Sequence, residues 1–268
     1  INVVIPPVSI GDTILTIRKF KKNLLSINDL ISVGAITVKI AELIKSCVEN
    51  KLNIIVSGAA STGKTTLLNI ISNFIPENER IITIEETVEL NLKSKNSIKL
   101  ECRPANLEGK GEITLRDLIR NSLRMRPDRI LVGEIRGVEA IDVLQAMNTG
   151  HEGSMTTIHA NSPEDLISRL ETMLLMSASN LSPSSARRII ASSIDLIIHL
   201  QRISTGKRVL SNISELVKCK KNKNSECDLK IRDIYTMIND NGTNTFKFTG
   251  NFPTFLNKIN LKESDFVL

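Results

Sequence analysis

The chain is poor in aromatic residues, has few cysteines and lacks long apolar runs. Phe, Tyr and Trp make up 3% of its 268 residues, with no Trp, which counts against the stacking platforms that bind single-stranded nucleic acid. The four cysteines form no C-x-x-C pair. This pattern disfavours a zinc knuckle or a redox motif and favours free thiols in a reducing compartment, so we expect a cytoplasmic protein.

No apolar run nears the length needed to cross a bilayer, and no signal peptide is visible. The chain opens on Ile1, inside "INVVIPP", so we expect it to begin part-way through a larger protein. The net charge of +6 is not by itself a nucleic-acid signature. Part of it lies in basic clusters at 18–22 and 218–223, which are either solvated loops or contacts for anionic lipid headgroups.

Short apolar segments alternate with helical patterns through most of the chain, which predicts an α/β fold with a mostly parallel sheet covered on both faces. Two further strands are expected near the start, around a Pro- and Gly-containing turn. After about residue 200 the pattern changes to antiparallel strands, so we expect 201–268 to be a small β-rich C-terminal extension. The strands expected in the sheet are 52–58, 80–86, 129–135 and 154–160, and the helices are 28–50, 65–75, 114–125, 138–150, 162–176 and 182–193.

The segment "GAASTGKTTL" matches G-x-x-x-x-G-K-[ST] between an expected strand and an expected helix, where a phosphate-binding loop is needed. Successive backbone N–H groups and the helix N-terminus then face phosphate oxygens. Lys64 would reach the β- and γ-phosphates, and the Thr65 hydroxyl would ligate Mg²⁺. The sequence therefore predicts ATP and Mg²⁺ as ligands. The candidate nucleotide contacts are Gly58, Ala59, Ala60, Ser61, Thr62, Gly63, Lys64, Thr65 and Thr66.

Carboxylates stand at the ends of two expected strands. Glu134 would face the crevice outside the strand ends, where open α/β sheets bind ligands. It could hold Mg²⁺, partly through water, or polarise the attacking water; a strand-end charge in solvent is the plain alternative. Glu85 and Glu86 follow the strand at 80–86, and neighbouring side chains on an extended backbone point opposite ways. We predict that Glu85 is the base that orients water.

Arg116, Arg120 and Arg124 are spaced four apart on the expected helix at 114–125, so they should form a stripe on one face. A solvated basic face is one interpretation. The other is that Arg120 and Arg124 act in catalysis by reaching the γ-phosphate bound to a neighbouring subunit.

The segment "GHEGSMTTIHAN" holds two of the three histidines. A metal site would need more ligands than His151, His159 and Glu152 readily supply. His159 ends the strand at 154–160, at the same rim as Glu134, where it could hydrogen-bond a phosphate or the catalytic water. A structural histidine is the alternative.

Four segments in this order resemble the motifs of the ATPases of type II and type IV secretion and of type IV pili. "GAASTGKTT" is similar to the family's Walker A motif, "ITIEETVEL" to its Asp box, "RMRPDRILVGEIRG" to its Walker B region and "GHEGSMTTIHAN" to its His box. The residues of these segments are most similar to those of the Tad/Flp pilus branch, the CpaF-like ATPases. Glu85-Glu86 stands where Glu-Asp is usual, and Ala59 and Ala60 replace the usual glycine and small hydroxyl residue.

The resemblance implies a RecA-like P-loop ATPase domain over 23–200, preceded in 1–22 by the truncated tail of an N-terminal domain and its linker. It implies a ring-shaped homohexamer at the inner face of the cytoplasmic membrane, working with inner-membrane platform proteins. It makes Arg18 a candidate nucleotide contact and His159 part of a γ-phosphate sensor. Nucleic acid is not an expected partner, although a RecA-like DNA translocase and a nucleotide-dependent scaffold with little turnover remain alternatives.

Overall fold

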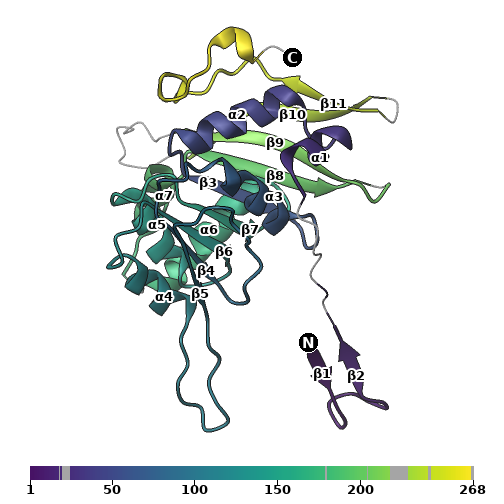
Figure 1. Cartoon of the computed structure of the whole chain (residues 1–268), viewed down its shortest axis with the longest axis vertical. Helices are drawn as coiled ribbons and strands as arrows, with labels where there is room; N and C mark the ends of the chain where they lie inside the picture. Colours follow the sequence, from purple (N-terminus) through teal and green to yellow (C-terminus); the bar gives the residue numbers. More distant parts are fainter. Residues whose placement is uncertain are drawn as a thin grey trace.

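The computed structural model contains one nine-stranded sheet with helices on both faces, and a separate two-stranded sheet near the N-terminus (Figure 1). The structure describes residues 1–17, 19, 25–178, 180–203, 205–217, 229–240 and 243–266. The strands are β1 (Asn2–Val4), β2 (Ile14–Thr16), β3 (Ile54–Gly58), β4 (Ile81–Glu85), β5 (Ser97–Glu101), β6 (Arg129–Ile135), β7 (Met155–His159), β8 (Leu196–Arg202), β9 (Arg208–Val217), β10 (Lys230–Asp240) and β11 (Thr243–Phe248). The helices are α1 (Ile27–Ser32), α2 (Val38–Glu49), α3 (Lys64–Ile71), α4 (Leu115–Ser122), α5 (Ala140–Asn148), α6 (Pro163–Ser177) and α7 (Pro183–Ser193), with 3-10 turns at Ser72–Phe74, Leu256–Lys258 and Glu263–Asp265.

The large sheet has the strand order β11-β10-β9-β8-β3-β7-β6-β4-β5. From β8 to β5 all neighbouring strands are parallel, whereas β8, β9, β10 and β11 pair antiparallel. In the parallel part, the carboxyl ends of β3, β4, β6 and β7 therefore meet at one edge. This is the edge at which an open α/β sheet binds ligands.

Alternate residues of β3 enter two different cores. Ile54 and Val56 pack with α2 and α3 on one face, while Ile55 packs with the cluster formed by α4, α5, α6 and α7 on the other. All five residues of β3 are buried. The continuous apolar run is thus explained by a strand that is covered on both sides.

Most of the elements expected from the sequence are confirmed. Helix α6 matches the helix expected at 162–176 to within one residue at each end. Ser162 is its N-cap and accepts a hydrogen bond from the N–H of Asp165, and Pro163 lies in its first turn. Gly150 follows the Thr149 C-cap of α5 with φ +93°, a backbone angle that glycine adopts readily. The two strands expected near the start are present as β1 and β2, and they pair antiparallel.

The prediction was wrong in detail for one helix, and it missed a strand. The single helix expected at 28–50 is two helices, α1 and α2, and Gly34 between them has φ +70°. Strand β5 was not expected, because its sequence "SIKLE" carries charges and it forms the edge of the sheet, where only part of each side chain is buried.

The antiparallel strands expected after residue 200 are present as β9, β10 and β11. They continue the large sheet through β8 instead of forming a sheet of their own. Tyr235 of β10 is almost fully buried, stacks with Phe266 and donates a hydrogen bond from its hydroxyl to the Phe266 carbonyl (2.8 Å). In the part of the chain that the structure describes, no helix is both long and apolar enough to cross a membrane.

Candidate active site

The loop between β3 and α3 is a tight turn held by its own backbone. Gly58 has φ +154°, and a Cβ atom there would lie 2.5 Å from the Leu200 carbonyl oxygen and 2.6 Å from the Thr62 hydroxyl. The Thr62 hydroxyl donates to the Ala59 carbonyl (2.9 Å). Gly63 is in the left-handed conformation and begins α3. The glycines are therefore required by a close approach at Gly58 and by a left-handed angle at Gly63.

The first turn of α3 presents open hydrogen-bond donors. The backbone N–H groups of Lys64, Thr65 and Thr66 meet no hydrogen-bond acceptor among the described residues. Lys64 is 8% exposed, and its Nζ donates to the Ala59 carbonyl (3.1 Å). Burial lowers the pKa of Lys64; nearby Arg136 lowers it further, while Glu134 opposes the shift. These donors form a concave site for an anion.

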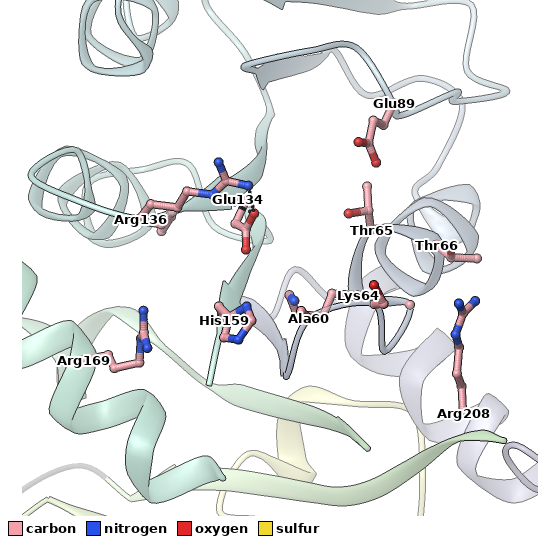
Figure 2. A pocket seen from close by; sticks show the side chains of 13 residues that line it. Ala60, Lys64, Thr65, Thr66, Glu89, Glu134, Arg136, His159, Arg169 and Arg208 are labelled. Carbon is pink, nitrogen blue, oxygen red and sulfur yellow. Dashed lines mark hydrogen bonds and ion pairs between the residues drawn. The ribbon is translucent and has the colours of Figure 1, made fainter. Parts of the chain in front are cut away.

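A cavity of about 950 Å³ opens over this turn (Figure 2). Four cationic side chains face two carboxylates in its lining, so the cavity favours a ligand with negative charge. The lining residues are Ala60, Ser61, Gly63, Lys64, Thr65, Thr66, Glu89, Glu134, Ile135, Arg136, His159, Arg169 and Arg208. Gly58, Ala59 and Thr62, which were also predicted as nucleotide contacts, support the turn from behind and do not line the cavity.

The structure brings Lys64, Glu134 and His159 to one cavity, as their positions at strand ends predicted. His159 is paired with Gly58 in the register of β7 and β3. The Thr157 hydroxyl donates to the Gly133 carbonyl (2.8 Å), which ties the end of β7 to β6 just before Glu134. The ends of β7 and β6, which carry His159 and Glu134, are therefore held together next to the phosphate loop.

Glu134 is held by a neighbour that the sequence analysis did not single out. Arg136 donates to the Glu134 carboxylate from Nε (2.9 Å) and Nη2 (2.5 Å), and to Glu86 from Nη1 (2.8 Å). Hydrogen bonding to Glu134 raises the pKa of Arg136, burial opposes the shift, and the nearby negative charges of Glu134 and Glu86 add to it. Arg136 thus bridges the carboxylates at the ends of β4 and β6.

Glu85 does not line the cavity. Its side chain is almost fully buried, and its Oε1 accepts from the backbone N–H groups of Glu89 and Leu90 (both 3.0 Å). Burial raises the pKa of Glu85, and these two hydrogen bonds oppose the shift. A Cβ atom added to Gly133 would lie only 3.0 Å from the Cγ atom of Glu85, so the glycine leaves room for this side chain. The Glu85 carboxylate therefore anchors the turn after β4, and Glu89 is the carboxylate of this segment that reaches the cavity.

The arginine stripe expected on α4 is broken. Helix α4 ends at Ser122, so Arg124 lies beyond it, and the expectation that it shares a helical face with Arg116 and Arg120 was wrong. Arg116 and Arg120 both donate to Asp142 of α5 (2.7 and 2.9 Å). These arginines tie α4 to α5, and neither Arg120 nor Arg124 lines this chain's own cavity. Arg18 and most of the two basic clusters lie outside the described residues.

Two further arginines complete the cavity. Arg169 comes from α6 and Arg208 from β9, and neither has an anionic partner among the described residues (Figure 2). The strand order β9-β8-β3 brings Arg208 beside the phosphate loop. Neither arginine belongs to a motif that the sequence analysis identified. The spatial order of the strands, which brings Arg208 to the cavity, cannot be read from the local periodicity of the sequence.

The donor set suits Mg²⁺ better than a tightly caged transition metal. In the described part of the chain, no group of three or more His, Cys, Asp and Glu side chains is arranged to hold a metal ion. Thr65 and Glu134 offer oxygen atoms within the same cavity. Mg²⁺ keeps several waters and binds through few protein oxygens plus phosphates, so these two residues fit that ion.

A family model described as type II/IV secretion system protein matches residues 2–245. The chain belongs to this family. Rv3659c of Mycobacterium tuberculosis, a protein named for conjugal transfer, is 38% identical over 216 residues, covering 81% of this chain and 61% of the relative. The chain thus spans less than two thirds of the length of this curated relative.

Two solved structures, one of a secretion-system ATPase and one of a pilus retraction motor, are similar to the chain. The VirB11 ATPase of the Brucella suis type IV secretion system, in complex with sulphate, has a TM-score of 0.60 at 30% identity, covering 75% of this chain and 60% of that one. The pilus retraction motor PilT with bound ADP has a TM-score of 0.54 at 27% identity, covering 72% and 53%. The chain shares the mixed α/β fold of these two solved structures.

Proposed function

We propose that this chain is the motor part of a secretion or pilus-assembly ATPase that hydrolyses MgATP. The observation that carries the proposal is the meeting of Lys64, Glu134 and His159 at one cationic cavity over a glycine-containing turn. The family model and the solved relatives support the same activity. ATP is the proposed substrate, and Mg²⁺ is the ion that accompanies it.

The chain's own residues account for phosphate binding. The open N–H groups of the first turn of α3 would donate to phosphate oxygens, and Lys64 would exchange its bond to the Ala59 carbonyl for a phosphate oxygen. Arg169 and Arg208 add charge from two other elements. Because these two guanidinium groups have no anionic partner among the described residues, the ligand need not break an ion pair to engage them.

Mg²⁺, when bound, neutralises charge on the phosphate oxygens. Thr65 and Glu134 would hold it, with Glu134 acting partly through water. Glu134 is ion-paired with Arg136, so it must first leave that guanidinium, and Glu86 would keep Arg136 in place. His159 would donate to a phosphate oxygen or orient the attacking water. For Glu85 to act as the base, its carboxylate would have to leave the two backbone donors that now hold it.

The assembly is part of the proposal. We infer a homohexamer of the Tad/Flp type at the inner face of the cytoplasmic membrane, driving pilin or protein export through inner-membrane platform proteins. Residues 1–22 would be the tail of an N-terminal domain, 23–200 the RecA-like P-loop domain and 201–268 the C-terminal extension. Arg120 or Arg124 would act in a neighbouring subunit's site only if its side chain moved away from the position that it has in this structure. Nucleic acid is not a proposed partner.

The test is phosphate release from MgATP. Wild-type protein is expected to turn over, and Lys64→Ala is expected to lose activity because the variant lacks the buried cation of the cradle. Lys45→Ala is the matched control, since Lys45 is a surface residue of α2 that pairs only weakly with Glu49 (3.8 Å). Equal activity of Lys64→Ala and Lys45→Ala would contradict the proposal. Stimulation by DNA would point to a translocase instead.

A further inference from the structure

Arg136 follows β6 and lies between two carboxylates at the edge of the nucleotide cavity (Figure 2). Its Nε and Nη2 atoms both donate to Oε2 of Glu134 (2.9 and 2.5 Å), and its Nη1 atom donates to Oε2 of Glu86 (2.8 Å). Among the residues that the structure describes, no other group donates a hydrogen bond to the Glu134 carboxylate. Arg136 therefore fixes the orientation of a carboxylate that is proposed to help hold Mg²⁺.

The turn that carries Arg136 is itself held in place by a buried carboxylate. Oε1 of Glu139 accepts hydrogen bonds from the backbone N–H groups of Arg136 (2.7 Å) and Gly137 (2.9 Å). A Cβ atom on Gly137 would lie 3.2 Å from the other oxygen of this carboxylate, so the glycine leaves room for it. The backbone of Arg136 is thus anchored, while its side chain, which is 60% exposed, is not packed into the core.

We propose that Arg136 is a positioning residue that competes with Mg²⁺ for the Glu134 carboxylate, and that Glu86 retains Arg136 when the ion binds. This inference rests on the proposed ATPase function, because it concerns how Thr65 and Glu134 take up the ion that accompanies the nucleotide. A guanidinium and a divalent ion on one carboxylate are close neighbours, and two positive charges at such a separation repel one another. Glu86 can keep its hydrogen bond to Nη1 after Arg136 has released Glu134.

The competition predicts opposite effects of two substitutions on the Mg²⁺ requirement. Calorimetry gives the Kd for ADP at increasing Mg²⁺, and hence the Mg²⁺ concentration that produces half of the full change in Kd. Arg136→Gln removes the competing cation and should lower this concentration roughly 5-fold or more, the scale of one close pair of charges in a solvated site. Glu86→Gln should raise it, because Glu134 is then the only carboxylate among the described residues that accepts from the Arg136 side chain.

Two controls separate this competition from the general charge of the site. In a Glu134→Gln background, adding Arg136→Gln should change the Mg²⁺ dependence no further, because the carboxylate for which the two cations compete is gone. Arg187→Gln removes an arginine that pairs with Glu171 (2.6 Å) and does not line the cavity, so it should leave the Mg²⁺ dependence as in the wild type. An equal shift in the Glu134→Gln background, or shifts of the same sign for Arg136→Gln and Glu86→Gln, would overturn the proposal.

Titration with ADP in EDTA keeps this test apart from the test of the ATPase itself. Binding of ADP without Mg²⁺ shows that each variant is folded and that its phosphate loop is intact. It also measures separately any affinity that ADP loses because Arg136 is one of the cations lining the cavity. A wild-type protein that binds no ADP would refute the ATPase. A wild type that binds ADP with no dependence on Mg²⁺, or with the same dependence as Arg136→Gln, would refute the competition alone.

Discussion

Replacing Gly58 by alanine tests the geometry of the phosphate loop directly. The φ of +154° is one that residues with a Cβ rarely adopt, at a cost of ~1–3 kcal/mol. The new Cβ would also lie 2.5 Å from the Leu200 carbonyl oxygen, which belongs to the backbone of β8 and cannot rotate away. Overpacking of this kind costs about 1–3 kcal/mol. The two effects together predict a loss of roughly 2–6 kcal/mol in the free energy of unfolding.

Gly250→Ala is the matched control. Gly250 also has a positive φ, +88°, but a Cβ there would meet nothing within 4 Å. Only the cost of holding alanine in the left-handed backbone conformation remains, which is about 1–2 kcal/mol. Urea denaturation measures both variants, and titration with ADP measures whether the loop still binds. A Gly58→Ala variant that is destabilised no more than Gly250→Ala, and that binds ADP as the wild type does, would contradict the close approach at Gly58.

Three further predictions concern other parts of the site and its support. Arg208→Gln should raise the Kd for ATP by about 10-fold or more, which is the contribution of one hydrogen bond to a charged group. Arg202→Gln is the control, because Arg202 lies on neighbouring β8 and does not line the cavity, so it should leave the Kd unchanged. Equal effects of the two substitutions would contradict a role for Arg208. Arg129→Met should cost ~3–5 kcal/mol in urea denaturation, because fully buried Arg129 pairs with Glu79 (2.6 Å), and adding Glu79→Gln should recover part of that loss. Burial lowers the pKa of His199 below 6.5, so the unfolded chain takes up a proton that the folded one refuses. The free energy of unfolding should therefore fall as the pH drops below about 6.5, and a wild-type pH profile identical to that of His199→Gln would exclude this contribution.

The sequence predicted the parts of the fold and of the site that depend on local pattern. The strand ends carrying Glu134 and His159 were placed correctly, because buried parallel strands are short apolar runs and their carboxyl ends share one edge. The phosphate loop followed from glycine spacing and from Lys64 at the start of a helix.

The parts of the site that the sequence did not predict depend on the spatial order of the strands and on which side chains pair with one another. Arg208 reaches the cavity only because β9 pairs with β8, and β8 with β3. Glu85 was expected at the cavity, but its carboxylate turns back to two backbone N–H groups, and local alternation does not reveal that choice. One interpretation of Arg120 made it available for a neighbouring subunit and the other placed it in solvent, but it pairs with Asp142 of α5, 22 residues away in the sequence.

Calorimetric titration of the protein with a non-hydrolysable MgATP analogue tests the central claim most directly. The account predicts binding to wild-type protein that Lys64→Ala abolishes and Lys45→Ala leaves intact, since only Lys64 lies in the cavity formed with Glu134 and His159. A folded wild-type protein that does not bind the analogue, or a Lys64→Ala variant that binds it equally well, would contradict the account.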